Sequence, residues 1–148
     1  MGFKFSQFSK DNLASCHPDL QLIGETAIKC TPMDFAITEG YRTKERQYEL
    51  YLQGKSRISG KGKNKSKHNY KHSRAFDVVP IINGKASWDP TNQTFLAGII
   101  LAIGEVFFKR GNLKLRLRRG GNWDGDGIII KDQSFIDLPH FELLGVKE

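Results

Sequence analysis

Cysteine is scarce in this chain, which contains only Cys16 and Cys30 among its 148 residues. The two do not form a CxxC motif and fall on apolar stretches with helical spacing. We therefore expect buried free thiols rather than a disulfide or a cysteine-ligated zinc site. The N-terminus also lacks an apolar stretch behind its first charge, so we expect no cleaved secretory signal and synthesis in the cytoplasm.

No apolar run in the sequence is long enough to cross a bilayer. The longest, residues 95–108, is interrupted by Gly98, Gly104 and Glu105 and falls short of the roughly 20 residues that a span requires. We expect a buried helix there and no membrane span. The chain shows no internal repeat and no domain boundary, and 39% hydrophobic residues suffice for one core. The sequence predicts a single domain over residues 1–148, with a monomer as the default.

Positive charge predominates over negative charge. The chain has 23 Lys and Arg residues and 16 Asp and Glu residues, a net charge of +7, and the basic residues concentrate at 55–67 and 109–119. Such a surface attracts polyanions, and nucleic acid, anionic cell-wall polymers and lipopolysaccharide all qualify. No zinc finger or RNP-like aromatic pattern accompanies the charge, so we expect no specific nucleic-acid partner.

The spacing of apolar residues predicts helices and strands mixed without βαβ regularity. We expect helices at 20–30, at 91–110, and from an N-cap at Thr43 to a stop at Gly54. Strands are expected at 35–38, 74–80, 113–118, 128–130 and within 135–144, and residues 54–67 read as a mobile surface loop. The prediction is an α+β domain with a small antiparallel sheet flanked by helices.

Two of the four histidines have carboxylates at short spacings. Asp77 lies nine residues after His68, while Asp137 precedes His140 by three residues and Glu142 follows it by two. A catalytic zinc takes three N or O protein ligands and leaves one position to water, so two histidines and a carboxylate form a complete set. A further carboxylate must take the proton of that water, and Asp137 is suitably spaced. Glu142 suits the orientation of a ligand imidazole.

Four segments together resemble a known family. They are residues 40–43, which read Gly-Tyr-Arg-Thr, then Ser66 and His68 with Ala75 and Asp77, then the Gly-Gly-Asn-Trp turn at 120–123, and finally residues 137–142, which read Asp-Leu-Pro-His-Phe-Glu. In this order they resemble the zinc peptidases of the D-alanyl-D-alanine carboxypeptidase type. The likeness is greatest to the phage endolysins that cleave between L-alanine and D-glutamate.

The resemblance implies a role for each matching residue. His68, Asp77 and His140 would bind Zn²⁺, and Asp137 would be the catalytic base. Arg42 would lie beside the metal and either hold a substrate carboxylate or polarise the scissile carbonyl, because its guanidinium is permanently charged and forked. The implied fold is the one shared with lysostaphin-type peptidases and the hedgehog signalling domain.

The first metal motif departs from the family pattern in its spacing. The family places the aspartate seven residues after the histidine, whereas here the interval is nine and residues 70–73 replace a glycine. His72 is therefore an alternative ligand to His68. We favour His68, because Ser66 stands two residues before it as in the motif and a loop can absorb two residues.

The resemblance implies an endolysin that hydrolyses the L-alanyl-D-glutamate bond of peptidoglycan. Such an enzyme is made in the host cytoplasm and acts on the cell wall at lysis, where a basic surface would hold the anionic envelope. Two other functions stay open, namely a D-alanyl-D-alanine carboxypeptidase or dipeptidase and a non-catalytic, zinc-stabilised wall-binding module. A nucleic-acid binder that uses residues 55–67 is a third.

Overall fold

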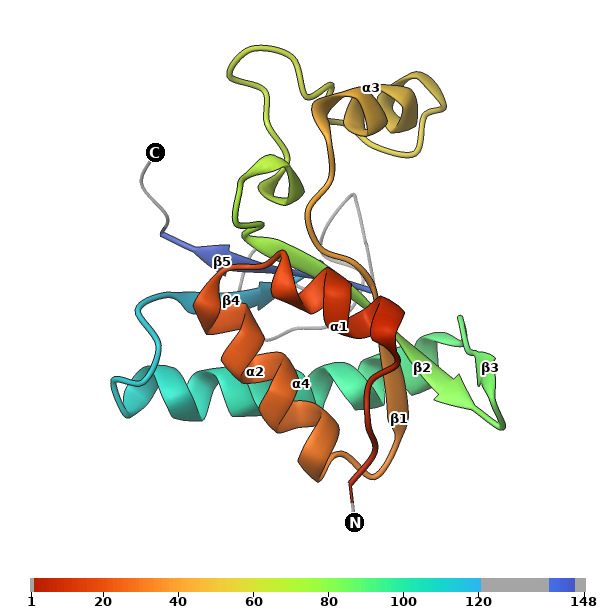
Figure 1. Cartoon of the computed structure of the whole chain (residues 1–148), viewed down its shortest axis with the longest axis vertical. Helices are drawn as coiled ribbons and strands as arrows, with labels where there is room; N and C mark the ends of the chain where they lie inside the picture. The colour runs from red at the N-terminus through yellow and green to blue at the C-terminus, as the bar shows by residue number, and fades with distance from the viewer. Residues whose placement is uncertain (1, 121–138, 146–148) are drawn as a thin grey trace.

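The computed structural model describes residues 2–120 and 139–145. The helices are α1 (Gln7–Ala14), α2 (Pro18–Cys30), α3 (Lys44–Leu52) and α4 (Pro90–Lys109), with the short 3-10 helix η1 (Lys67–Asn69). The strands are β1 (Asp34–Glu39), β2 (Ala75–Ile82), β3 (Lys85–Ala86), β4 (Arg116–Arg119) and β5 (His140–Leu144). They form one antiparallel sheet in the order β1-β2-β5-β4, with β3 paired to β2 (Figure 1). The predicted α+β class is confirmed.

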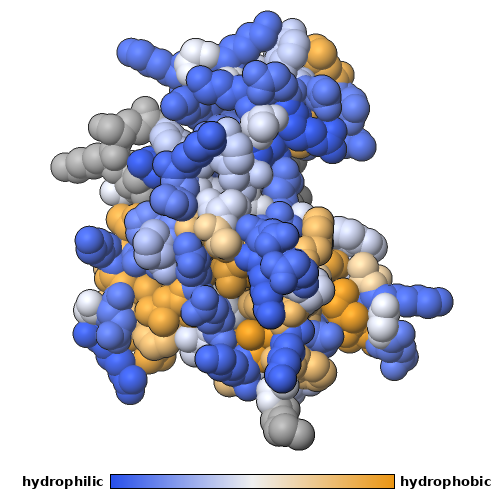
Figure 2. Space-filling model, in the orientation of Figure 1, coloured by the Kyte–Doolittle hydropathy of each residue, from blue (hydrophilic) through white to orange (hydrophobic). Residues whose placement is uncertain are grey.

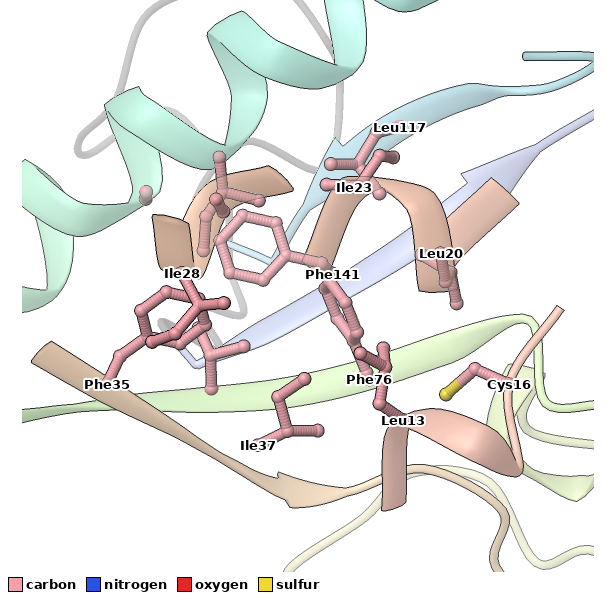
Figure 3. Packing of buried hydrophobic residues seen from close by; sticks show 14 of the residues in the cluster. Leu13, Cys16, Leu20, Ile23, Ile28, Phe35, Ile37, Phe76, Leu117 and Phe141 are labelled. Atoms are coloured by element: carbon pink, nitrogen blue, oxygen red, sulfur yellow. The ribbon is translucent and has the colours of Figure 1, made fainter. Parts of the chain in front are cut away.

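The two faces of the sheet have different environments because side chains alternate along each strand. Phe76 of β2 and Phe141 of β5 are fully buried and meet edge to face, with ring centroids 5.9 Å apart (Figure 3). The same core includes residues from three helices, such as Leu13 of α1, Ile23 of α2 and Leu96 of α4. Asp77 is next to Phe76 in β2, and His140 is next to Phe141 in β5. Their side chains therefore project from the opposite face of the sheet.

Helix α2 matches the predicted helix. A contact from its first turn also explains why β4 begins later than the strand expected at 113–118. The Nδ1 atom of His17 accepts the backbone N–H of Asp19 at 3.0 Å and caps the helix. The Asp19 carboxylate in turn accepts the backbone N–H groups of Lys114 and Leu115 at 2.9 and 3.1 Å. These two amides are satisfied by a side chain rather than by a neighbouring strand, and β4 begins only at Arg116.

Helix α1 was not predicted. Ser6 caps it by accepting the backbone N–H of Ser9 at 3.3 Å. Only Ser9 and Leu13 are buried along its eight residues, so the sequence offers almost no apolar periodicity to detect. The Ser9 hydroxyl accepts the backbone N–H of Ile37 at 3.0 Å and joins the helix to β1.

Helix α4 is longer than its apolar run and is only half-buried. Leu96, Ala97 and Ile100 face the core, whereas Phe95 and Val106 are exposed, so the expectation of a buried helix is correct for one side only. Within the described residues, α4 alone has the length and composition of a membrane span. The core helix of a soluble protein passes the same test, and α4 packs against α2, β2 and β4.

The two cysteines differ in their environment. Cys16 is fully buried, as expected, but Cys30 is exposed, and both are free thiols. The prediction for Cys30 is wrong because it is the last residue of α2, beyond Ile28, the last residue with which this helix contributes to the core.

Helix α3 and the segment that follows it stand apart from the other three helices, beyond the end of the sheet (Figure 1). Thr43 caps α3 by accepting the backbone N–H of Arg46 at 3.1 Å, as the sequence predicts. Residues 53–66 connect α3 to η1 without a helix or strand, so the predicted connection is a loop, although it ends one residue earlier because Lys67 already belongs to η1. This region is strongly hydrophilic in the space-filling view (Figure 2).

Candidate metal centre

Strand pairing brings two of the predicted ligands together. Asp77 of β2 is the register partner of His140 of β5, and on its other side it pairs with Glu39 of β1. All three stand at the end of the sheet below α3. Asp77 and His140 are thus neighbours because β2 and β5 pair antiparallel in a register that places them opposite each other.

The third predicted ligand, His68, reaches the same place from η1. The Ser66 hydroxyl accepts the backbone N–H of His68 at 3.2 Å, and the Asn69 side-chain oxygen accepts the backbone N–H of Ser66 at 2.8 Å. This reciprocal capping fixes the short helix. The backbone of Arg42 then donates to the carbonyl of His68 at 2.8 Å and ties η1 to the start of α3.

Three metal-ligating groups converge at one point. The Nε2 atom of His68 lies 3.2 Å from Asp77 Oδ1 and 3.2 Å from His140 Nδ1, and His140 Nδ1 lies 3.2 Å from Asp77 Oδ1. His68 is 1% exposed and His140 is 7% exposed, so both imidazoles are shielded from water. Among the residues that the structure describes, these three form the one group able to hold a metal ion.

The outer nitrogen of each imidazole has its own acceptor. His68 Nδ1 lies 2.7 Å from the carbonyl oxygen of Gly40, and His140 Nε2 lies 3.0 Å from Glu142 Oε1. With the N–H on these outer nitrogens, both inner nitrogens present lone pairs to Asp77. Gly40 has to be glycine, because a Cβ there would collide with the carbonyl oxygen of Asn12.

The geometry and chemistry of this group suit a divalent cation. Three acceptors that meet with no donor between them repel one another unless a positive charge lies among them. Ligands 2.0–2.1 Å from a tetrahedral ion lie about 3.3 Å from one another, close to the separations found here. The residues present therefore fit a metal ion bound by two imidazoles and one carboxylate.

The acidic side chains of the site are held in their charged form. Burial would raise the pKa of Asp77, but positive charge on the His68 and His140 imidazoles in their protonated form, together with their hydrogen bonds to the carboxylate, holds that pKa well below its ordinary value. A bound cation would supply the same positive charge when the inner nitrogens are unprotonated. Burial likewise opposes ionisation of Glu142, yet His140 and Arg118 lower its pKa. Arg118 Nη2 donates to Glu142 Oε2 at 2.8 Å, so His140, Glu142 and Arg118 form a chain that leads away from the metal centre.

Arg42 lies at the edge of the metal centre, where the sequence placed it. Its guanidinium makes a two-pronged ion pair with Glu39, at 2.7 and 2.6 Å, and donates to the side-chain oxygen of Gln47 at 2.8 Å. Its Nη2 atom lies 3.9 Å from Asp77 Oδ2. Sequence reasoning missed Glu39 and Gln47, although the spacing of three residues between Glu39 and Arg42 is a signal that could have suggested the ion pair.

Of the other predicted residues, the structure describes only His72 and the first glycine of the predicted turn. His72, the alternative ligand, is exposed and does not belong to the metal-binding group, whereas His68 does. Asp137, the Gly-Gly-Asn-Trp turn beyond Gly120 and the strand at 128–130 lie outside the described residues.

A cavity of about 570 Å³ opens over the metal centre. Its floor is formed by His68, Asp77 and His140, and one wall comes from α3 and the segment after it. A cavity of this size falls in the range of ligand-binding pockets, and its lining includes the three groups that could hold a metal ion.

Comparison with known proteins identifies the family. The family model for the phage L-alanyl-D-glutamate peptidase matches residues 1–144. An L-alanyl-D-glutamate peptidase of Escherichia phage T5 is 33% identical over 128 residues, which are 86% of each chain. The crystal structure of the Serratia marcescens L-Ala D-Glu endopeptidase ChiX superposes with a TM-score of 0.70 at 26% identity and covers 95% of this chain and 90% of that one. The chain therefore belongs to the phage L-alanyl-D-glutamate peptidase family.

Proposed function

We propose that the chain is a zinc-dependent endolysin that hydrolyses the L-alanyl-D-glutamate bond of the peptidoglycan stem. The observation that carries the proposal is the convergence of His68, Asp77 and His140 at mutual distances of 3.2 Å, in a chain that belongs to a peptidase family. Two nitrogens and one oxygen form the ligand set of catalytic zinc sites that keep a fourth position open.

In this proposal the zinc ion, Asp137 and Glu142 have separate tasks. Zinc, when bound, would lower the pKa of a water molecule and polarise the scissile carbonyl. Asp137 accepts the proton of that water and passes it to the departing amine. Glu142 keeps His140 in the required tautomer through its 3.0 Å contact.

Arg42 binds an oxygen of the substrate next to the metal. Its ion pair with Glu39 and its hydrogen bond to Gln47 fix the guanidinium before the substrate arrives, which reduces the entropy lost on binding. Its permanent positive charge can stabilise the negative charge that develops on the scissile carbonyl oxygen, and it can equally bind a substrate carboxylate.

The place of action follows from the same proposal. The protein is made in the host cytoplasm and acts on the cell wall at lysis, and its net charge of +7 favours contact with the anionic envelope. A monomer suffices, because the three ligands and Arg42 come from one chain.

The substitution Asp137→Ala separates catalysis from metal binding. We expect the variant to retain bound zinc, measured by elemental analysis, while release of fragments from purified peptidoglycan falls by at least about 100-fold. Loss of zinc along with activity would assign Asp137 to the ligand set. Unchanged activity would remove it from the mechanism.

A further inference from the structure

The cavity over the metal centre is strongly basic on one side. Seven basic side chains and three acidic ones line it. The acids, Glu39, Asp77 and Glu142, all lie at the metal centre and are engaged there by Arg42, the histidines and Arg118. On the opposite wall, Arg46 pairs with Glu49 at 3.2 Å, and Glu49 does not line the cavity. Positive charge therefore exceeds negative charge among the lining residues.

The basic wall is formed by one continuous stretch of chain. It consists of Arg46 from α3, Lys55 and Arg57 from the segment after it, and Lys65 and Lys67 at η1. Figure 2 shows hydrophilic side chains over this part of the molecule. The basic segment that the sequence predicts as a surface loop thus lines the cavity over the metal centre.

The wall is tied to the metal centre through Gln47. This side chain is fully buried, and its amide donates to Ser56 Oγ at 2.9 Å and to the carbonyl oxygen of Ile58 at 2.7 Å. Its oxygen accepts from Arg42 at 2.8 Å. Arg57 lies between Ser56 and Ile58, which Gln47 holds. This part of the wall is therefore held in position relative to Arg42.

The chemistry of the substrate supplies a matching negative charge. Glutamate has two carboxyl groups, and at most one of them continues the peptide chain. The other stays free a few bonds from the amide that joins glutamate to alanine. A basic wall beside the metal centre therefore faces a substrate that carries at least one carboxylate next to the scissile bond.

We propose that the basic wall of Arg46, Lys55, Arg57, Lys65 and Lys67 recognises the free carboxylate of the glutamyl residue and makes the enzyme selective for stems in which it is charged. This inference rests on the proposed function, because it assumes cleavage at that residue. Stems whose free carboxyl is converted to a carboxamide would be poor substrates, since a neutral amide carries no negative charge to pair with lysine and arginine and offers one acceptor oxygen where a carboxylate offers two.

The test uses the full chain loaded with zinc and two synthetic stem peptides. The peptides differ only in whether the free carboxyl of D-glutamate is a carboxylate or a carboxamide. We expect kcat/KM to be about tenfold higher for the carboxylate, mainly through KM, and the preference to shrink as salt is raised. The variant Lys55→Gln with Lys65→Gln should reduce the preference measurably, because it removes two of the five basic side chains of the wall.

A matched variant distinguishes the wall from the overall charge. Lys63→Gln with Lys85→Gln removes the same charge from two exposed lysines that do not line the cavity, and it should keep the full preference. Equal rates for the two peptides with the unmodified enzyme, or an undiminished preference in the Lys55 and Lys65 variant, would overturn the inference and leave the proposed function standing. Failure to cleave either peptide would overturn both.

Discussion

Gln47 and Arg42 are joined by a hydrogen bond of 2.8 Å, in which a fully buried amide oxygen accepts from the guanidinium beside the metal centre. The same amide holds the segment around Ser56 and Ile58. One side chain thus links the edge of the metal centre to the wall of its cavity, although it does not itself line the cavity.

Replacement of Gln47 by leucine should therefore impair both stability and activity. The change leaves the Ile58 carbonyl and one guanidinium N–H without this partner, which costs about 1–3 kcal/mol of unfolding free energy. Loss of Arg42 positioning should lower kcat/KM by up to about 100-fold. Thermal unfolding and peptide hydrolysis measure the two effects. Gln53→Leu, at the exposed end of α3, is the control and should change neither quantity.

The choice between two histidines can be tested directly. His68→Ala should abolish zinc binding and activity, because it removes one of the three proposed ligands. His72→Ala should keep both, since His72 is exposed outside this group. Elemental analysis after dialysis gives the metal content. Zinc retained in the first variant and lost in the second would reverse the assignment.

Glu142 should govern metal affinity without binding the metal. Glu142→Gln weakens the contact that orients His140, and substitutions of this kind lower metal affinity about 10- to 100-fold. Titration against a competing zinc chelator measures the change. Glu105→Gln, which breaks an ion pair with Arg116 far from the centre, serves as the control. Equal affinities in the two variants would contradict the role given to Glu142.

Zinc removal should also lower the thermal stability of the protein. A ligand that binds the folded state alone stabilises it by about 2.7 kcal/mol at 100 times its dissociation constant. We expect the unfolding temperature to fall on treatment with a chelator and to recover with zinc. The His68→Ala variant should show no such response, and a shift of equal size in that variant would point to binding elsewhere.

The two thiols should differ sharply in reactivity. Burial raises the pKa of Cys16 to about 12, so at about pH 8 its thiol stays protonated, and the thiolate is the reactive species. Cys30 is exposed. A thiol reagent should modify one cysteine in the folded protein and two in the denatured one, and Cys30→Ser should leave the folded protein unreactive. Rapid modification of that variant would show that the core opens readily.

Local patterns in the sequence predicted most of the elements that carry the site. The N-cap at Thr43, the strand around Asp77 and a strand within residues 135–144 were all anticipated, because capping and alternation are short-range signals. The convergence of His68, Asp77 and His140 was anticipated only through the family resemblance. Spacing in the sequence alone does not specify which strands pair.

Residues that act through tertiary contacts could not be predicted. Gln47 reads as one more polar residue on an exposed helix, and its burial depends on how residues 56–60 fold back over α3. Asp19 caps the backbone of residues about 95 positions further on, which shortens β4 in a way that no local pattern indicates. Partners this distant in sequence emerge only when the fold is known.

The central claim is metal-dependent cleavage between L-alanine and D-glutamate, and mass spectrometry of peptidoglycan fragments tests it most directly. Purified Gram-negative peptidoglycan would be digested by the protein as prepared, after chelation, and after zinc is restored. We predict soluble peptides that begin at D-glutamate, which disappear with the chelator and return with zinc. Loss of terminal D-alanine alone would instead identify a carboxypeptidase, and no release by the zinc-loaded protein would contradict an enzymatic role.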